Sequence, residues 1–271
     1  MRAGSRCSVL TGACLLVCCV LSQAAERVVS LAPSMTDIML ELGVESRLVG
    51  VLDASERPAS LAGLPSVGRY GQVNIEKIVS LHPDLILLWP GAVPSAQREQ
   101  LKQLGYTIET LDVHRLDELA DGLARIAQAV GAPGEGQRLV SQFRERLASV
   151  RNRYRQLPTV HVFYQVWDKP LYTVGGTQII SDAIEVCGGR NIFADLSQPA
   201  PQVGVEAVLT RNPEVILAMD QAQLEPWRQW PTLKAVAHHQ LWAVGDKRLE
   251  RPSYGMLDAV VRLCELIDKA R

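Results

Sequence analysis

The sequence lacks the short motifs that mark the common enzyme sites. It has no GxSxG nucleophile elbow, no GxGxxG loop after an expected strand, no phosphate-binding P-loop and no HExxH zinc motif. Histidine is sparse and scattered, at His82, His114 and His161, apart from the neighbours His238 and His239. Adjacent side chains on one element point apart and chelate a metal poorly. We therefore expect no catalytic residues and no metal site, and an enzyme is the weaker alternative.

An excess of one charge is also lacking. The 28 Lys and Arg residues nearly balance the 29 Asp and Glu residues, the formal net charge is −1, and no long basic run occurs. Nucleic acid is therefore a poor candidate partner. With 271 residues, of which 47% are hydrophobic and 21% charged, the chain has the composition of a globular protein with one large or two modest domains.

Residues 1–24 have the pattern of a secretory signal peptide. Arg2 and Arg6 form a basic start, residues 7–21 form an uncharged apolar run, and residues 22–24 supply small residues for cleavage. The run is too short to span a bilayer as a helix. We expect export to the periplasm, with a lipid anchor on a cysteine of this segment or a buried N-terminal helix as alternatives.

Cysteine is scarce after this segment, where only Cys187 and Cys264 remain. An even pair in an oxidising compartment favours a disulfide, and the alternative is two buried thiols. Neither cysteine has a CxxC partner or a neighbouring histidine, which argues against a zinc site.

The mature chain alternates short apolar runs with helical patterns, which predicts an α/β fold with mostly parallel sheets. Residues 25–132 form the expected N-terminal lobe, which ends in a break at residues 131–134. Residues 133–157 contain one long connecting helix, clearest over 137–156, which we expect to limit movement between lobes. Residues 158–271 form a second, similar lobe. The expected strands are 27–31, 48–52, 85–88, 107–111, 160–164 and 241–244, and the expected helices of the first lobe are 36–42, 75–81, 96–104 and 116–130.

An internal repeat supports two lobes of similar build. Residues 73–88 align with residues 203–218 without a gap, and Val, Glu, Pro, Ile and Leu recur at matching positions. Each copy is a predicted helix, a proline-containing turn and a buried strand. The alternative is chance similarity between two helix–turn–strand units.

Aromatic residues make up only 5% of the chain, yet several fall next to predicted strands. Ligands of open α/β sheets sit outside the carboxyl ends of the strands, and flat aromatic side chains there suit a large, partly apolar ligand. The alternative is that each aromatic packs in a core, which is our interpretation of Trp227, Trp230 and Trp242. The candidates at strand ends are Tyr70, Trp89, Trp167 and Tyr172, with the polar residues Asp246 and Arg251 after the last strand.

Glu76 and Glu206 occupy the first turn of the two repeat helices. A carboxylate at that position is stabilised by the helix macrodipole, by about 0.3–1 kcal/mol. Its duplication suggests a pair of acidic groups on one surface, which could dock a two-fold symmetric partner through arginines.

Three segments carry a resemblance to a known family: RVVSLAPS at 27–34, NIEKIVSLHPD at 74–84 and EVCGGRNIF at 185–193. They are similar to motifs of the periplasmic binding proteins whose two lobes are joined by one long helix and which serve ABC importers of siderophores, haem and cobalamin. The resemblance covers essentially all of the mature chain. It implies a monomeric carrier, a small-molecule ligand rather than a cofactor, and an inner-membrane ABC permease as partner.

Within that family the chain most resembles the cobalamin-binding members, through LLWPG at 87–91, PQV at 201–203 and the cysteine pair. This likeness implies a corrinoid ligand and places Glu76 and Glu206 at permease-docking positions. Ala54 and Ala200 stand where aromatics would be expected, so the space could admit a different corrinoid. Haem, a ferric siderophore, and outside this family a structural envelope protein, are the alternatives. The ligand-contact positions implied are Ser34, Tyr70, Trp89, Tyr172, Asp246 and Arg251.

Overall fold

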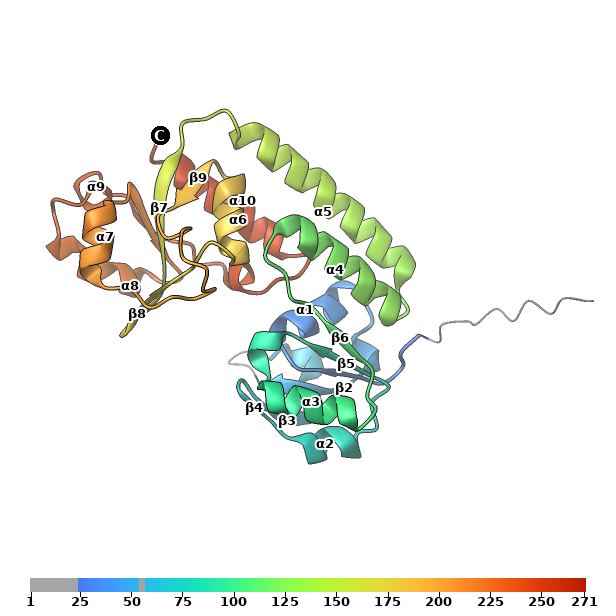
Figure 1. Cartoon of the computed structure of the whole chain (residues 1–271). Coiled ribbons are helices and arrows are strands. Elements are labelled where there is room, and N and C mark those ends of the chain that lie inside the picture. The colour runs from blue at the N-terminus through green and yellow to red at the C-terminus, as the bar shows by residue number, and fades with distance from the viewer. Residues whose placement is uncertain (1–23, 54–56) are drawn as a thin grey trace, which may run out of the picture.

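The computed structural model describes residues 24–53 and 57–271 (Figure 1). The expected signal peptide, apart from its last residue, and Ala54 lie outside the described residues. Two sheets, each flanked by helices, are joined by the long helix α5 (Pro133–Tyr154). This is the predicted α/β architecture of two similar lobes. None of the described helices combines the length and apolar character that crossing a bilayer requires.

The N-terminal lobe is built on a six-stranded sheet with the order β4-β3-β2-β1-β5-β6. All neighbouring strands are parallel except β3 and β4, which form a hairpin. The central strands β1 and β5 are fully buried, as expected for apolar runs in a parallel sheet. The strands are β1 (Val28–Ser30), β2 (Leu48–Asp53), β3 (Ser66–Arg69), β4 (Gln72–Val73), β5 (Leu85–Leu88) and β6 (Ile108–Thr110), and the helices are α1 (Pro33–Glu41), α2 (Ile75–Ser80), α3 (Ser95–Gln103) and α4 (Leu116–Ala129).

The C-terminal sheet has the order β11-β10-β7-β8, with β9 paired to the first part of β7. Only the β7–β8 pair is antiparallel. The strands are β7 (Val160–Asp168), β8 (Leu171–Thr173), β9 (Gly189–Asn191), β10 (Val215–Ala218) and β11 (Leu241–Ala243), and the helices are α6 (Ile179–Val186), α7 (Val205–Arg211), α8 (Gln221–Leu224), α9 (Lys234–Ala237) and α10 (Met256–Asp268). Short 3-10 turns complete the two lobes: η1 (Glu45–Arg47), η2 (Ala59–Leu61), η3 (Pro90–Ala92), η4 (Glu225–Gln229) and η5 (Lys247–Glu250).

Two expected boundaries were wrong, the beginning of α1 and the end of β7. Helix α1 begins at Pro33 instead of at residue 36. Strand β7 continues to Asp168 instead of ending at residue 164, because its second half gains the antiparallel partner β8. Helix α5 begins at Pro133, the first residue of the expected connecting segment 133–157. Proline is well tolerated at a first helical position, and Gly136 lets α5 approach α4 closely, since a Cβ there would lie 2.2 Å from the Cβ of Ala127.

The internal repeat is also a repeat in space, as α2–β5 and α7–β10. The residue before the proline has a left-handed φ in both copies, 46° and 43°. The acidic residue after the proline also makes the same kind of hydrogen bond in both copies. Asp84 accepts a hydrogen bond from the backbone N–H of Glu26, and Glu214 accepts one from the N–H of His161. Each carboxylate therefore fixes the chain at the beginning of the central strand of its lobe, β1 or β7.

Partly buried hydrogen bonds join the two lobes beside α5. The carboxylate of Glu41, at the end of α1, accepts hydrogen bonds from the Ser253 hydroxyl and from the N–H groups of Tyr254 and Gly255, at 2.8–3.0 Å. Burial raises the pKa of Glu41, although these donors favour the ionised form. Glycine at position 255 leaves room for the Glu41 carboxylate, because a Cβ there would lie 2.9 Å from its oxygen.

A second junction lies between α4 and α6. Asp182 accepts the backbone N–H of Leu116 at 2.8 Å and forms an ion pair with Arg115 at 2.9 Å. Its side chain is nearly inaccessible, and burial raises its pKa. Two carboxylates therefore tie the ends of the N-terminal lobe to helices or loops of the C-terminal lobe.

The apolar core is continuous between the lobes. One cluster of buried side chains includes residues of β1, β5, α4, α5, α6 and α10, and a second, smaller cluster covers the other face of the C-terminal sheet. Trp227 is buried in the second cluster and donates its indole N–H to Gln165 at 2.6 Å. Trp230 and Trp242 are partly buried against the two clusters. The interpretation of these three tryptophans as packing residues is confirmed.

The expected disulfide joins Cys187, after α6, to Cys264 in α10, with a Cα–Cα distance of 4.6 Å. The sequence separation is 77 residues, and chain-entropy reasoning gives about 4–5 kcal/mol of stabilisation for a loop of this size.

We predict that replacing both cysteines with serine lowers the free energy of unfolding by up to this amount in urea titrations. Thiol titration of denatured, non-reduced protein checks the bond itself, and two free thiols per mature chain would contradict it.

The Glu41 junction generates a second prediction. Glu41→Ala removes the acceptor of three hydrogen bonds and should lower the free energy of unfolding by about 1–3 kcal/mol. Urea unfolding followed by circular dichroism measures the change. Glu145→Ala is the matched control, because this exposed glutamate of α5 makes no side-chain hydrogen bond in the described structure and should change stability by no more than about 0.5 kcal/mol. Equal stability of the two variants would contradict the junction's role.

Candidate functional site

Tyr70 and Trp89 lie together at the carboxyl edge of the N-terminal sheet. Tyr70 directly follows β3 and Trp89 directly follows β5, and their ring centroids are 6.1 Å apart. Both side chains are unusually exposed for large aromatics, at 63% and 40%. The turns beneath them are joined, because the N–H of Gly71 donates to the carbonyl of Ala92 at 2.9 Å. The two rings therefore form an exposed aromatic surface on turns that are hydrogen-bonded to each other, outside the apolar core.

The C-terminal lobe presents aromatics on the β7–β8 hairpin. Trp167 is 57% exposed and is the register partner of Tyr172, so both side chains are on the same face of the hairpin. The Trp167 indole N–H donates to the carbonyl of Lys169 at 3.2 Å, which limits its movement. In Figure 1 the carboxyl ends of β3 and β7 both lie on the side of the molecule opposite α5.

Trp167 is one of the aromatics expected at strand ends, but it is outside the predicted contact set. Among the described residues, the exposed large aromatics are Tyr70, Trp89 and Trp167. The signal in the sequence was the Lys169-Pro170 turn between two short apolar runs, which indicates a hairpin. Ala200, one of the two positions expected to be aromatic, is exposed and lies next to this hairpin, because the following residue, Pro201, accepts the N–H of Thr173 at 3.1 Å.

Ser34 and Arg251 are not part of the exposed aromatic surface. Ser34 is buried in the first turn of α1. Arg251 reaches from the C-terminal lobe to Asp37 of α1, with an N–O distance of 3.7 Å. Burial raises the pKa of Asp37, and Arg251 partly offsets this shift. Arg251 and the first turn of α1 line a cavity of about 20 Å³, which is room for about one water molecule.

Asp246 is engaged within its own loop. Its carboxylate bonds the guanidinium of Arg248 at 2.7 and 3.0 Å, and this interaction lowers its pKa. Arg248 also pairs with Asp258 at 2.8 Å. The loop contains the 3-10 turn η5. The side chains of Asp246 and Arg251 therefore already have protein partners.

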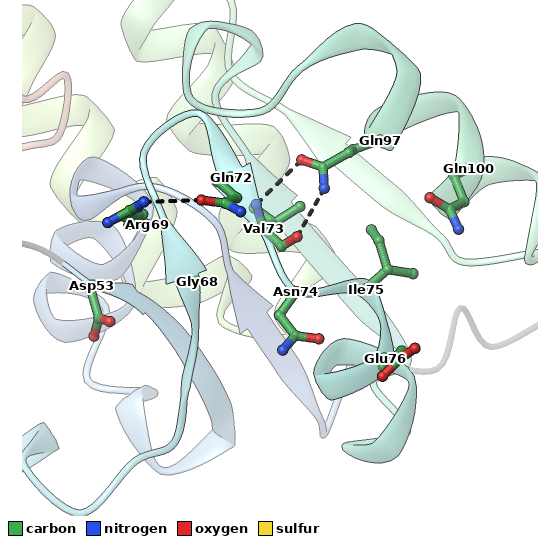
Figure 2. A pocket seen from close by; sticks show the side chains of 10 residues that line it. All are labelled: Asp53, Gly68, Arg69, Gln72, Val73, Asn74, Ile75, Glu76, Gln97 and Gln100. Carbon is green, nitrogen blue, oxygen red and sulfur yellow. Dashed lines mark hydrogen bonds between the residues drawn. The ribbon is translucent and has the colours of Figure 1, made fainter.

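Glu76 and Glu206 hold equivalent places, each the second residue of its helix. Both are exposed, and neither carboxylate forms an ion pair or a side-chain hydrogen bond within the part of the chain that is described. Figure 1 shows α2 and α7 at the outer ends of the two lobes, away from α5. Beside Glu76 is a polar hollow of about 590 Å³ (Figure 2), lined by Asp53, Gly68, Arg69, Gln72, Val73, Asn74, Ile75, Glu76, Gln97 and Gln100.

Within residues 24–53 and 57–271, no group of three or more His, Cys, Asp or Glu side chains is placed to hold a metal ion. The candidate site consists of the exposed aromatic surfaces at the strand ends of the two lobes.

Residues 28–246 match the sequence model of the periplasmic binding proteins. This chain belongs to that family. It is 38% identical over 250 residues to the vitamin B12-binding protein of Vibrio cholerae serotype O1, covering 91% of each chain. The two-lobed fold of this periplasmic binding protein is also that of solved relatives. The crystal structure of the periplasmic vitamin B12 binding protein BtuF of Vibrio cholerae matches with a TM-score of 0.84, covering 91% of this chain and 98% of that one.

A haem-binding member is similar in fold but less so in sequence. The periplasmic haem-binding protein RhuT from Roseiflexus sp. RS-1 matches with a TM-score of 0.78 at 25% identity, covering 91% of this chain and 99% of that one. The predicted family and fold class are thus confirmed for this periplasmic binding protein.

Proposed function

We propose that the protein binds a corrinoid such as cobalamin between its two lobes and delivers it to an inner-membrane ABC permease. In this proposal it acts as a monomer in the periplasm, after removal of a signal peptide, and catalyses no reaction. The observation that carries the proposal is the exposure of Tyr70, Trp89 and Trp167 at strand ends of both lobes, in a chain 38% identical to a vitamin B12-binding protein.

The chemistry of a corrinoid suits these surfaces. A corrin ring is broad and flat, with apolar faces and a rim of amide side chains. Aromatic side chains stack on such faces and bury area worth roughly 25 cal/mol per Å². The rim amides would meet polar groups at the edge of the site, which is the role proposed for Ser34, Asp246 and Arg251. Tyr172, which is half-buried on β8, would add to the stacking surface.

The pairing of the arginines favours this ligand over a ferric siderophore. Carriers of anionic siderophores usually need clustered, available cationic side chains. Arg69 is bonded to Gln72, Arg248 to Asp246 and Asp258, and Arg251 is paired with Asp37. An anion would therefore have to compete with partners that these arginines already have.

Calorimetric titration of the mature protein tests the ligand. Cyanocobalamin should bind at a one-to-one ratio, and Trp89→Ala or Trp167→Ala should each weaken binding by about 1–3 kcal/mol through lost stacking and burial. Trp230→Phe, a change at a packing residue, is the control and should leave affinity unchanged. Absence of corrinoid binding together with tight binding of haem or a ferric siderophore would overturn the proposal.

Charge reversal tests the docking role proposed for Glu76 and Glu206. The double variant Glu76→Arg, Glu206→Arg should keep its ligand affinity and fold, because both carboxylates are exposed and have no partner among the described residues. Uptake through the reconstituted permease should fall more than about tenfold, since like charges at an interface cost several kcal/mol.

A second double variant controls for net charge. Glu145→Arg with Glu265→Arg makes the same charge change at exposed positions on α5 and α10 and should transport normally. Wild-type uptake by the Glu76/Glu206 variant would leave these glutamates with only their helix-dipole role. Loss of ligand binding in that variant would instead place them in the cleft.

A further inference from the structure

One short segment carries both an aromatic of the proposed ligand site and a glutamate of the proposed docking surface. Tyr70 lies in the turn between β3 and β4, and Glu76 lies in the first turn of α2, directly after β4. The position of the two-residue strand β4 therefore affects both side chains. What holds β4 in place is a question about function as well as about folding.

The inner side of β4 is paired conventionally with β3. Val73 is the register partner of Gly68, and the N–H of Asn74 donates to the carbonyl of Val67 at 2.8 Å. Only a residue without a side chain fits at Gly68, which has φ 121° and where a Cβ would lie 2.5 Å from the carbonyl oxygen of Gln72.

The outer side of β4 is at the edge of the sheet, where no further strand of the described structure pairs with it. The Gln97 side chain makes the hydrogen bonds there that a neighbouring strand would make. The Gln97 carboxamide, from α3, accepts the N–H of Val73 at 3.2 Å and donates to the carbonyl of Val73 at 2.8 Å (Figure 2). This two-bond pattern is the one a neighbouring strand would supply. Gln97 is half-buried in this position.

In the C-terminal lobe, the equivalent segment before α7 is held by backbone hydrogen bonds instead of by a side chain. Val203 is the repeat equivalent of Val73, and its N–H donates to the carbonyl of Leu171 in β8 at 3.0 Å. Next to it, Gln202 forms a β-bridge with Tyr172. In the C-terminal lobe, strand β8, which carries Tyr172, thus fixes the segment before α7. In the N-terminal lobe, the Gln97 side chain fixes the equivalent segment before α2.

We infer that Gln97 is a positioning residue that fixes β4 so that Tyr70 faces the ligand and Glu76 faces the permease. The inference rests on the function proposed above for the residues on either side of β4. Gln97 itself touches neither proposed partner; it acts through the two hydrogen bonds to Val73. Its loss should therefore affect two separate binding events at once.

The test compares Gln97→Met with Gln103→Met. Gln103 is an exposed residue of the same helix without a side-chain hydrogen bond in the described structure. Gln97→Met should weaken binding of cyanocobalamin and of permease in nanodiscs, each by about fivefold, the scale of one or two net hydrogen bonds. Gln103→Met should change neither. Wild-type affinities in Gln97→Met, or a loss confined to one of them, would overturn the inference.

Gln97→Glu adds a readout that a general loss of stability would not produce. Its ionised carboxylate still accepts from Val73 but repels the Val73 carbonyl, whereas the protonated acid restores the donor. The affinity deficit relative to wild type should therefore be larger at pH 7.5 than near pH 4.5, around the usual pKa of glutamate of about 4.3. A deficit independent of pH would count against the hydrogen-bond mechanism.

Hydrogen exchange without ligand separates this inference from the proposed function. Peptides covering residues 70–76 should exchange faster in Gln97→Met than in wild type or Gln103→Met. Unchanged exchange would overturn the role of Gln97 whatever the ligand. Failure of the wild-type protein to bind any corrinoid would overturn the proposed function alone, and the exchange result would still decide whether Gln97 fixes β4.

Discussion

The junction between the lobes is the constraint on which the rest of the structure depends. α5 spans it, but the lobes are also tied by two carboxylates, the partly buried Glu41 at the end of α1 and the buried Asp182 in α6. Each is desolvated, which is costly unless donors are in place. Because backbone N–H donors to both carboxylates come from the opposite lobe, these hydrogen bonds form only when the lobes stand in this arrangement. The continuous apolar core reinforces the same arrangement.

A fixed junction explains how the aromatic surfaces can remain open. Large exposed aromatics tend to collapse onto other apolar surface, and a hinge would allow the two lobes to bury them against each other. Here the turns beneath Tyr70 and Trp89 are bonded to each other and the Trp167 indole is bonded to its own hairpin. The junction therefore holds these surfaces apart, and the proposed ligand would meet a largely preformed site.

Features that depend on local pattern could be predicted from the sequence. Buried strands such as β5 were apparent as apolar runs, and the repeat predicted equivalent helices for Glu76 and Glu206. Features that depend on a distant partner were missed or misplaced. The extension of β7 to Asp168, for example, depends on its antiparallel partner β8. Gln97 and Glu41 have the appearance of ordinary surface residues in sequence, because their partners are brought to them only by the fold.

The central claim is that the two lobes form one frame around a preformed site. It is tested most directly by the distance between spin labels on introduced cysteines at Gln103 and Ala237, exposed positions of α3 and α9. The labelled protein lacks residues 1–24, so that its two remaining native cysteines, Cys187 and Cys264, are paired with each other. The account predicts a single distance that changes by less than about 2 Å when cyanocobalamin is added, as in other preorganised binding sites. A broad distribution without ligand, or a shift of several ångströms on binding, would contradict it.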